Sequence, residues 1–439
     1  MHQLSITADN LVSSLLRLSE KETVCLLDSC GVGHLGSHLL IAGIEPVEVF
    51  ELTNDDPSET LKFHDEKLCG ASAAIFTISY DFGQKLLGLK NREKEFTGSH
   101  EPDVYLALFD TLVVHDYNSG ETKLVGNCEK FAAIESKLCQ TTVEESITFD
   151  NTAEIQANFT KSKYIAAIET IKERIRDGDT YQTNLTQQIT VRMPDGLTPV
   201  VVFKRLRRVH PAPFAAFIKR SDSTVVSASP ERFFRVNKGS ARTIETSPIK
   251  GTRRRGITGI EDDQLRNDLL TSSKDRAENT MIVDLLRNDL GRVCEFGSVR
   301  VEKLCDLEEH PTLFHLVSTI SGELREEVKF SDILRAVFPC GSITGAPKFS
   351  TMKIIDEIET ANRGLSMGAI GYYVPGSWGL GLGTWDLSVA IRTMVIRDNT
   401  ATFNVGGGIT IDSDPEMEYD ETMLKAKALL NALCHMGTI

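Results

Sequence analysis

Apolar runs joined by short turns constrain the fold of this chain more than any other feature. The stretch "LSVAIRTMVIRDNTATFNVGGGIT", residues 387–410, has two such runs on either side of Asp398-Asn399, a pair that favours a tight hairpin turn. The runs "ETVCLLDS", "AAIFTISY" and "VYLALFDTLVVHDY" also have strand character. Strands joined by short turns pair antiparallel, because a parallel pair needs a long crossover. We therefore expect antiparallel sheets with helices rather than a parallel wound sheet.

The chain divides into two regions at a polar stretch. Strand-like runs extend to about Gly126, and the sequence after Cys139 has few candidates for a core. A helix, "KSKYIAAIETIKERIRDGD", is expected from about Thr160, and mixed strands and helices follow it. We expect an N-terminal region over residues 1–145 and a second region over residues 155–434.

Composition excludes several classes of protein. Hydrophobic residues make up 41% of the 439 residues, enough for a large core, but no run is long and apolar enough for a membrane helix. The net charge of −14 disfavours binding to nucleic acid and to anionic membranes. No signal peptide is apparent. The nine cysteines are scattered without CxxC pairs, which indicates reduced thiols in the cytoplasm and no structural zinc.

The hairpin at residues 387–410 contains one charged residue where an apolar one is expected. Its first strand, Val389–Ile396, is apolar apart from Arg392 and Thr393. A turn at Asp398-Asn399 places Arg392 opposite Val405, next to the glycines at 406–408. A guanidinium beside closely approachable backbone N–H groups is suited to a carboxylate or a phosphate. The alternative is a structural Arg–Asp pair beside a tight turn.

The C-terminal helix is predicted to carry carboxylates towards the core. It starts near "DSDPEMEY", where Ser413 and Glu416 fit a capping box. Glu418 lies three residues before Glu421, and Glu421 interrupts an apolar stripe at helical spacing formed by Met417, Leu424 and Ala428. A buried carboxylate needs a cation or a proton, so the pattern indicates a charged site.

A second helix, "SSKDRAENTMIVDLLRND", repeats this pattern. Glu278 leads into apolar residues, and Asp275 precedes it by three positions. Two helices with paired carboxylates are typical of oxygen ligands for Mg²⁺ rather than zinc. The alternative is separate ion pairs with lysine or arginine, with Asp275 completing a cap with Ser272.

The stretch "TIETSPIKGTRRRG" holds one amine in a rigid frame. Lys250 lies between Pro248-Ile249 and Gly251-Thr252, residues that fix a local bend. Lys250 is either a solvated surface residue or an amine directed at a substrate. The following run, residues 253–255, is either a solvated loop or a local attraction for an anionic substrate or a partner protein.

Two further residues are candidates for chemistry. Glu231 follows a strand in "SASPERFF" and is either an exposed turn acid or a functional carboxyl. His315, in "LFHLVSTI", points the same way as Leu313 and Val317 if this run is a strand. It is either a core histidine with satisfied hydrogen bonds or a group that orients a substrate.

Long ordered motifs give the chain a family resemblance. They are "GDTYQTNLTQQ", "SASPERFF", "SPIKGTRRRG", "DRAENTMIVDLLRNDLGRV", "FHLVSTISGEL", "FPCGSITGAPK", "GAIGYY", "AIRT" and "GGGITIDSDPEMEYDETMLKAKAL". In this order the chain resembles the chorismate-utilising enzymes over residues from about 155 to 434. The N-terminal third is similar more loosely, through "LLDS" and "ISYDFG". PIKGT is typical of component I of aminodeoxychorismate synthases, whereas component I of anthranilate synthases typically has PIAGT.

The resemblance implies a fold and a reaction. The fold is α+β, with two large antiparallel sheets packed together and helices outside. The reaction converts chorismate and ammonia to 4-amino-4-deoxychorismate in folate and 4-aminobenzoate synthesis, and it requires Mg²⁺. The ammonia comes from glutamine through a separate amidotransferase subunit, because this chain has no nucleophile elbow with cysteine.

The resemblance also implies roles for individual residues. Lys250 matches a proposed nucleophile, Glu231 a general acid, and His315 a histidine beside the reacting ring. Glu278 and Glu421 match direct Mg²⁺ ligands, and Asp275 and Glu418 outer ligands. The matching substrate contacts are Thr344, Tyr372, Arg392, Lys425 and the backbone at Gly406 and Gly408.

Some positions depart from the family pattern. Cys340 replaces a glycine of FPGGS, Ser247 replaces a common arginine, and HPAPF at residues 210–214 replaces NPAPF. The last motif belongs to a tryptophan pocket in relatives. Ser29, Pro213 and Phe214 are the candidates to line such a pocket here.

Other readings of the same residues remain open. Anthranilate synthase component I is the nearest alternative, since it uses the same site but adds ammonia at ring carbon 2 and releases pyruvate. Isochorismate or salicylate synthase would use water and a lysine placed elsewhere. An inactive relative that serves as a regulatory or binding subunit is a different class, against which the complete catalytic set argues.

Overall fold

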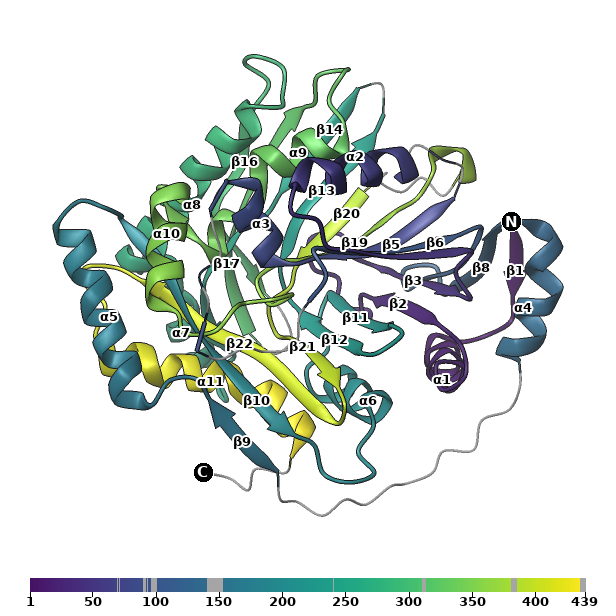
Figure 1. The fold of residues 1–439 in the computed structure, drawn as a ribbon, viewed down its shortest axis with the longest axis horizontal. Coiled ribbons are helices and arrows are strands. Elements are labelled where there is room, and N and C mark those ends of the chain that lie inside the picture. The colour runs from purple at the N-terminus through teal and green to yellow at the C-terminus, as the bar shows by residue number, and fades with distance from the viewer. Residues whose placement is uncertain are drawn as a thin grey trace.

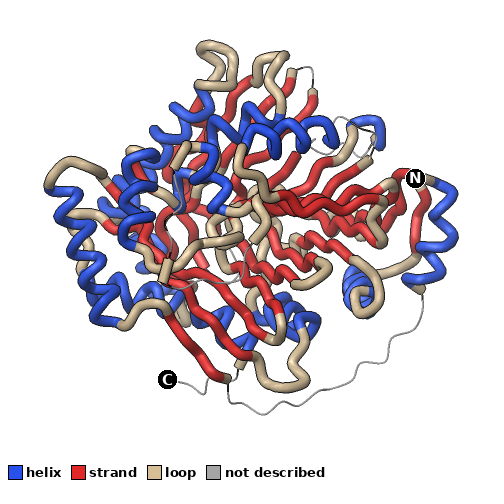
Figure 2. The backbone as a smooth tube through the Cα atoms, in the orientation of Figure 1, coloured by secondary structure: helices blue, strands red, loops and turns tan. Residues whose placement is uncertain are grey.

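Two antiparallel sheets form the centre of the molecule. The computed structural model describes residues 1–68, 70, 72–89, 92, 94–95, 101–139, 153–239, 241–309, 313–379 and 385–434. In Figure 2 the strands fill the middle and the helices lie around them. The antiparallel pairing and the α+β class predicted from the sequence are confirmed.

The first sheet has 12 strands. Its order is β1 (His2–Leu4), β8 (Glu121–Gly126), β7 (Thr111–Asp116), β3 (Leu39–Ile44), β2 (Val24–Asp28), β11 (Phe214–Lys219), β12 (Thr224–Ser229), β21 (Thr393–Arg397), β22 (Thr400–Ile409), β10 (Gln182–Arg192) and β18 (Gly345–Ala346), with β9 (Glu154–Ala157) beside β10.

The second sheet has 10 strands. Its order is β15 (Ile249–Arg254), β17 (Leu313–Glu323), β14 (Arg242–Thr246), β13 (Arg232–Lys238), β20 (Trp385–Val389), β19 (Ala369–Tyr373), β5 (Ala73–Ile78), β6 (Val104–Phe109) and β4 (Glu48–Leu52), with β16 (Arg300–Glu309) beside β17.

Each sheet buries apolar side chains on both faces. The inner faces meet in a cluster that includes Ile41, Ile75, Ile218 and Ile370. The outer face of the first sheet is covered by α1 (Ala8–Leu18), α4 (Phe131–Leu138), α6 (Pro199–Val209) and α11 (Pro415–Leu433). The outer face of the second sheet is covered by α2 (Pro57–Leu68), α3 (Tyr80–Leu86), α8 (Ser273–Gly291) and α9 (Phe330–Val337). The sheets are therefore the inner layers of the fold (Figure 1).

The remaining helices lie around one end of the two sheets. These are α5 (Lys161–Arg176), α7 (Gly259–Thr271) and α10 (Lys348–Ile358). In Figure 1 they gather with α8 and α11 around the ends of β10, β22 and β17. The helix expected from about Thr160 is confirmed, since the Thr160 side chain caps α5. No helix in the described part of the chain is long and apolar enough to cross a membrane.

The two regions expected from the sequence share both sheets. In the first sheet β2 pairs with β11, and in the second β5 pairs with β19. Strands from residues 1–145 therefore complete sheets that residues 155–434 also build. Such pairings join segments far apart in the sequence, so local patterns do not predict them.

The predicted strand Val389–Ile396 is wrong. β20 ends at Val389 in the second sheet, and β21 begins at Thr393 in the first. The chain crosses between the sheets at residues 390–392, where Arg392 has a left-handed φ of 48°. The hairpin turn is confirmed, because Asp398 and Asn399 have φ of 46° and 60° and Val395 pairs with Thr402.

The N-terminal end of α11 also differs from the prediction. Asp414, not Ser413, is the N-cap, and its side chain accepts a hydrogen bond from the backbone N–H of Met417. The stripe predicted to face the core is exposed at Met417 and Leu424. Helix α11 instead buries Glu418 and Thr422 together with apolar residues one turn further on. The carboxylate that the helix turns inwards is therefore Glu418 rather than Glu421.

Candidate active site

Lys250 lies on β15 at a point where the strand pairing shifts. The register between β15 and β17 changes between Ile249 and Thr252, and Gly251 has a φ of 83°. A side chain at Gly251 would also lie 2.9 Å from Leu269. Only glycine suits this position. The bend places the half-buried Lys250 amine 3.2 Å from the backbone carbonyl of Ser342, to which it donates a hydrogen bond. The amine is therefore held inside the fold.

Glu231 is buried between β12 and β13, so the interpretation as an exposed turn acid is wrong. Burial raises the pKa of its carboxyl to about 7, and Ser342, Lys250 and the backbone N–H of Ile249 oppose this only in part. Its Oε1 has no hydrogen-bond partner among the described residues. A protonated carboxyl near neutral pH can act as a general acid. Ser342 contacts both functional groups, since its side chain bonds Glu231 and its carbonyl bonds Lys250.

His315 lies on β17, opposite Thr252 of β15. The ring is buried, and its Nδ1 is 2.9 Å from the Thr252 hydroxyl. The ring of His34 lies 6.0 Å away, and its Nδ1 contacts the carboxylate of Glu308. The imidazole of His315 is thus held in one orientation by its neighbours.

Three carboxylates from two helices lie close to one ammonium. Lys274, in the first turn of α8, is 3.4 Å from Glu418 Oε1 on α11. Against the effect of partial burial, the charges of Glu418, Glu278 and Glu421 hold the pKa of Lys274 above its usual value. Burial raises the pKa of Glu278, although Lys250 and Lys274 oppose it. The carboxylates of α8 and α11 therefore face a common space.

Each of the three carboxylates has a further contact. Gln182 Nε2 lies 3.3 Å from Glu278 Oε2. The Ser413 hydroxyl lies 2.7 Å from Glu418 Oε1. Lys425 lies 2.8 Å from Glu421, whose side chain is 56% exposed, and against the effect of partial desolvation it lowers the pKa of that carboxyl. Oε1 of Glu418 thus accepts from two donors, Ser413 and Lys274, whereas Glu278 has a single contact among the described residues, with Gln182 at 3.3 Å.

These residues fit a divalent cation with oxygen ligands. The ammonium of Lys274 lies 3.4 Å from Glu418, and the charges of Glu278 and Glu421 also raise its pKa, so this region favours positive charge. In the described part of the chain, no group of three or more histidine, cysteine or acidic side chains is close enough to ligate one metal ion. Glu278 and Glu421 would therefore supply two ligands, and water or substrate oxygens the rest, as is common for Mg²⁺.

Asp275 and the three arginines lie outside this group. Arg253 contacts Asp268 and Asp275, at 2.6 and 3.1 Å. Arg254 and Arg255 pair with Glu261 and Asp262 of α7. The Ser272 side chain accepts a hydrogen bond from the Asp275 N–H, the capping interaction considered from the sequence. The arginine run thus binds α7 and α8 to β15.

The three glycines belong to β22 and not to a loop. Gly406 pairs with Thr186 and Gly408 with Asn184 of β10. The N–H of Asn404 donates to Ser366, away from β10, and the carbonyl of Gly406 accepts from Lys425. Because alternate residues of a strand face the same neighbour, the N–H groups of Gly406 and Gly408 also point away from β10. They are thus available to a ligand at this edge.

Arg392 lies at the start of the crossing that leads into β21. Its carbonyl accepts from Ala228 at 3.0 Å. Its guanidinium meets no acceptor or carboxylate among the described residues, and burial lowers its pKa. A half-buried cation of this kind is suited to an anionic ligand.

Thr344 is more constrained than a simple substrate contact. It is fully buried, and its hydroxyl donates to the carbonyl of Cys340 at 3.0 Å.

Several buried polar atoms, unlike the Thr344 hydroxyl, have no hydrogen-bond partner in the part of the chain that the structure describes. They include Gln182 Oε1, Thr183 Oγ1, Ser247 Oγ and Asn404 Oδ1. Of these residues, Gln182 belongs to the site described above, since its Nε2 contacts Glu278.

The comparisons with known proteins assign a family to this arrangement. The family model described as chorismate binding enzyme matches residues 22–431. The chain belongs to this family. Anthranilate synthase component 1 of Aquifex aeolicus (strain VF5) is 39% identical over 351 residues, which cover 76% of this chain and 69% of the relative. Aminodeoxychorismate synthase component 1 of Bacillus subtilis (strain 168) is 37% identical over 379 residues, which cover 82% and 76%.

A solved structure agrees with the family assignment. The crystal structure of anthranilate synthase component I from Streptococcus pneumoniae TIGR4 has a TM-score of 0.77 with 28% identity, and the match covers 90% of this chain and 93% of that one. The match spans strands of both sheets. The fold of this chorismate-binding enzyme is therefore that of component I enzymes.

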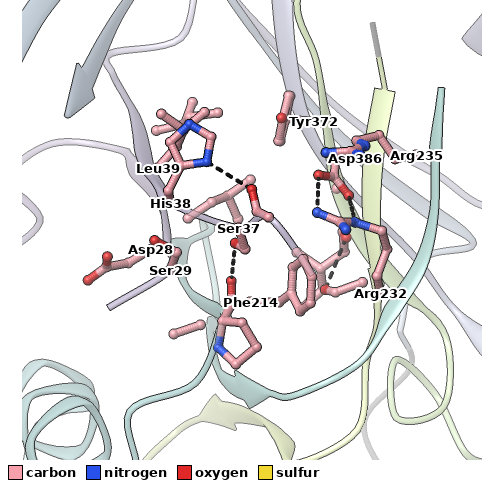
Figure 3. Close-up of a pocket in the computed structure, with 18 of the residues that line it drawn as sticks. Asp28, Ser29, Ser37, His38, Leu39, Phe214, Arg232, Arg235, Tyr372 and Asp386 are labelled. Carbon is pink, nitrogen blue, oxygen red and sulfur yellow. Dashed lines mark hydrogen bonds and ion pairs between the residues drawn. The ribbon is translucent and has the colours of Figure 1, made fainter. Parts of the chain in front are cut away.

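This chorismate-binding enzyme has a cavity of about 150 Å³ between the two sheets. Ser29, Pro213 and Phe214, the residues predicted for a tryptophan pocket, line it together with Tyr372 (Figure 3). Lys250, Glu278 and Glu421 are not among its lining residues. The structure thus brings Tyr372, expected at the substrate, to the cavity between the sheets. Arg232, which forms an ion pair with Asp386 there, directly follows Glu231 in the sequence.

Four residues around the site were not singled out from the sequence: Gln182, Thr252, Lys274 and Ser342. Two of them had a local signal, since Lys274 lies four residues before Glu278 and Gln182 lies within the motif "GDTYQTNLTQQ". Thr252 and Ser342 reach the site only through the pairing of β15 with β17 and the position of Ser342 beside Lys250.

Proposed function

We propose that this chorismate-binding enzyme converts chorismate and ammonia to 4-amino-4-deoxychorismate, with Lys250 as the nucleophile. The observation that supports it best is the position of the Lys250 amine. It is half-buried, donates to the backbone carbonyl of Ser342, and its charge acts on the carboxyls of Glu231, Glu278 and Glu421. An amine used only for surface charge would not be half-buried near three acidic side chains.

The chemistry divides into two displacements. The Lys250 nitrogen, having lost a proton, forms a bond to ring carbon 2, the ring double bond shifts, and the carbon 4–oxygen bond breaks. Glu231 donates the proton with which the hydroxyl leaves as water. Ammonia then forms a bond to carbon 4, the double bond shifts back, and the bond between Lys250 and carbon 2 breaks. Covalent catalysis thereby replaces one hard displacement with two easier ones.

The remaining residues bind and orient the substrate. Arg392 and the N–H groups of Gly406 and Gly408 are suited to a carboxylate of chorismate. His315 lies near the reacting ring in this scheme. Mg²⁺, held by Glu278 and Glu421 with Glu418 and Asp275 further out, would neutralise a substrate carboxylate and fix its position.

Ammonia is expected to come from a second protein. We propose a separate glutamine amidotransferase subunit as the partner, because component I enzymes depend on one. With glutamine as the sole nitrogen source, the isolated chain should form no product until such a subunit is added. Ammonium salts should replace it. Product from glutamine without the subunit would refute this part of the proposal.

One assay separates this function from its alternative. The purified chain is supplied with chorismate, Mg²⁺ and ammonium, and the products are analysed with and without a lyase that acts on aminodeoxychorismate. Formation of 4-aminobenzoate only with the lyase supports the proposal. Fluorescent anthranilate without the lyase supports anthranilate synthase, the function named for several relatives and one similar structure. Neither product would favour an inactive or isochorismate-forming relative.

The cavity between the two sheets suits a small ligand with both charged and apolar parts. Arg235, Ser29 and Asp386 supply polar groups, and Phe214 and Ile370 apolar ones. We propose tryptophan as the ligand, bound away from Lys250. His210, which departs from the family motif, is not among the described lining residues. Calorimetry with tryptophan tests this, with Ser29→Trp to fill the cavity as the control, and absence of binding to the unaltered protein would exclude it.

A further inference from the structure

The ammonium of Lys274 lies beside acidic side chains of two helices. Its nitrogen is 3.4 Å from Glu418 Oε1 on α11, and the charges of Glu278 on α8 and Glu421 on α11 also act on it. The Glu418 side chain is only 7% exposed, whereas that of Lys274 is 52% exposed. The carboxylate is therefore fixed in the fold, and the lysine side chain has free space into which it can move.

Local charge balance indicates what happens when a divalent cation enters. Three carboxylates, Glu278, Glu418 and Glu421, lie near three ammonium groups, Lys250, Lys274 and Lys425. Lys425 is bound to Glu421 and to the carbonyl of Gly406, and Lys250 to the carbonyl of Ser342. Lys274 has the longest contact of the three and the least constrained side chain. A cation placed between the helices would repel it first.

We propose that Lys274 is a built-in counter-ion that competes with Mg²⁺ for the carboxylates of α8 and α11. Without metal it neutralises the carboxylates and joins the two helices. When Mg²⁺ binds, Lys274 leaves towards solvent, so part of the metal's binding energy is used to displace it. The inference rests on the proposed Mg²⁺ site and concerns how tightly that site binds the ion.

The test is a titration with Mg²⁺ alone, without substrate, measured by calorimetry. Lys274→Met should bind Mg²⁺ about fivefold more tightly than the unaltered protein, the size expected for losing one partly exposed ion pair. Lys274→Arg keeps the charge and should bind Mg²⁺ as the unaltered protein does. Lys427→Met removes an exposed lysine of α11 that faces away from the carboxylates and should change nothing.

Two further measurements do not depend on turnover. Without metal, Lys274→Met should melt at a lower temperature than the unaltered protein, and Mg²⁺ should raise its melting temperature by more. In the unaltered protein, an amine-reactive reagent followed by peptide mass spectrometry should label Lys274 faster as Mg²⁺ is added. This last measurement needs no variant and therefore does not depend on whether a variant folds.

The outcomes distinguish this inference from the proposed function. Unchanged or weaker Mg²⁺ binding by Lys274→Met, or labelling of Lys274 that does not rise with Mg²⁺, overturns the inference. If the unaltered protein binds no Mg²⁺ at millimolar concentration, both the inference and the metal site fall. Formation of 4-aminobenzoate from chorismate is measured separately, so failure of the reaction with intact Mg²⁺ binding would refute the function alone.

Discussion

At the residue scale, the main feature of the site is that the buried carboxyl of Glu231 lies near the amine of Lys250. Glu231 and Lys250 share Ser342 as a neighbour, and their roles require opposite protonation states. Burial keeps a proton on the carboxyl near neutral pH. The sequence indicated Lys250 through its rigid frame of proline and glycine. It did not predict the burial of Glu231, because that depends on the pairing of β13 with β20, where the Val389 N–H donates to the Glu231 carbonyl, and on residues around Ser342.

Replacement of Lys250 tests the nucleophile. Lys250→Ala should leave chorismate binding largely intact, because Arg392, the glycine strand and the carboxylates remain. Formation of aminodeoxychorismate should fall by orders of magnitude, since the covalent route is lost. Some anthranilate should appear if ammonia reaches ring carbon 2 directly. Both products are measured with ammonium across pH, and unchanged aminodeoxychorismate synthesis would show that Lys250 is only a charge contact.

The Glu231 carboxyl gives the enzyme a predictable pH dependence. With its pKa raised to about 7, the acid form is lost as pH rises through 7, so turnover limited by proton donation should decline above that pH. Glu231→Gln cannot donate a proton and should reduce turnover by about 10²- to 10⁴-fold. A turnover–pH profile with the same decline in the Gln variant would assign that decline to another group.

The same carboxyl affects stability with a defined sign. Its ordinary pKa is 4.5 and its folded pKa about 7, so between these values the folded state binds more protons than the unfolded state. The free energy of unfolding should therefore decrease as pH rises from about 4.5 to 7. Denaturant titrations at several pH values should show a weaker decrease in Glu231→Gln. An identical slope in both proteins would contradict the assignment.

At the element scale, β22 supplies backbone rather than side chains to the site. The alternation of apolar residues predicted the hairpin and its register correctly. It did not reveal that β20 and β21 belong to different sheets, because both segments have the same apolar pattern. The prediction that Met417 and Leu424 of α11 face the core failed for a similar reason. Periodicity shows that residues share a face of a helix, but not whether another element covers that face.

Two neighbouring glycines of β22, Gly406 and Gly407, differ in the space that each leaves for a side chain. Alanine variants at these two positions therefore form a matched pair. A Cβ at Gly406 would lie 1.9 Å from the carbonyl oxygen of Leu185, whereas one at Gly407 would have its nearest neighbour at 3.3 Å, the end of the Glu418 side chain. Gly406→Ala should therefore lower the free energy of unfolding by about 3 kcal/mol or more. Gly407→Ala should fold nearly normally. Denaturant unfolding measures both, and equal effects would show that β10 can move away.

At the scale of the whole molecule, each sheet combines strands from distant parts of the chain. The sequence predicted the sheets and their class, and the resemblance predicted their packing. No local pattern specifies that β11 pairs with β2 or β19 with β5. The cavity lined by Ser29, Phe214 and Tyr372 depends on these long-range pairings, so its full set of residues could not be read from motifs.

These pairings predict that the second region does not fold alone. A fragment of residues 155–434 would leave β11 without β2 and β19 without β5, and Ile218 and Ile370 without Ile41 and Ile75. The fragment should lack a cooperative unfolding transition and should aggregate. Coexpression with residues 1–145 should restore a soluble complex. A monomeric fragment with a sharp thermal transition would show that residues 155–434 are an independent domain.

The position of the last hairpin has a consequence for synthesis of the protein. β21 and β22 lie between β12 and β10 in the first sheet, yet they follow both strands by more than 160 residues in the chain. Until residues 393–409 have been synthesised, β12 and β10 lack the neighbours that join them, and the nascent chain exposes two strand edges. The first sheet therefore cannot close while the segments that precede β21 are being translated.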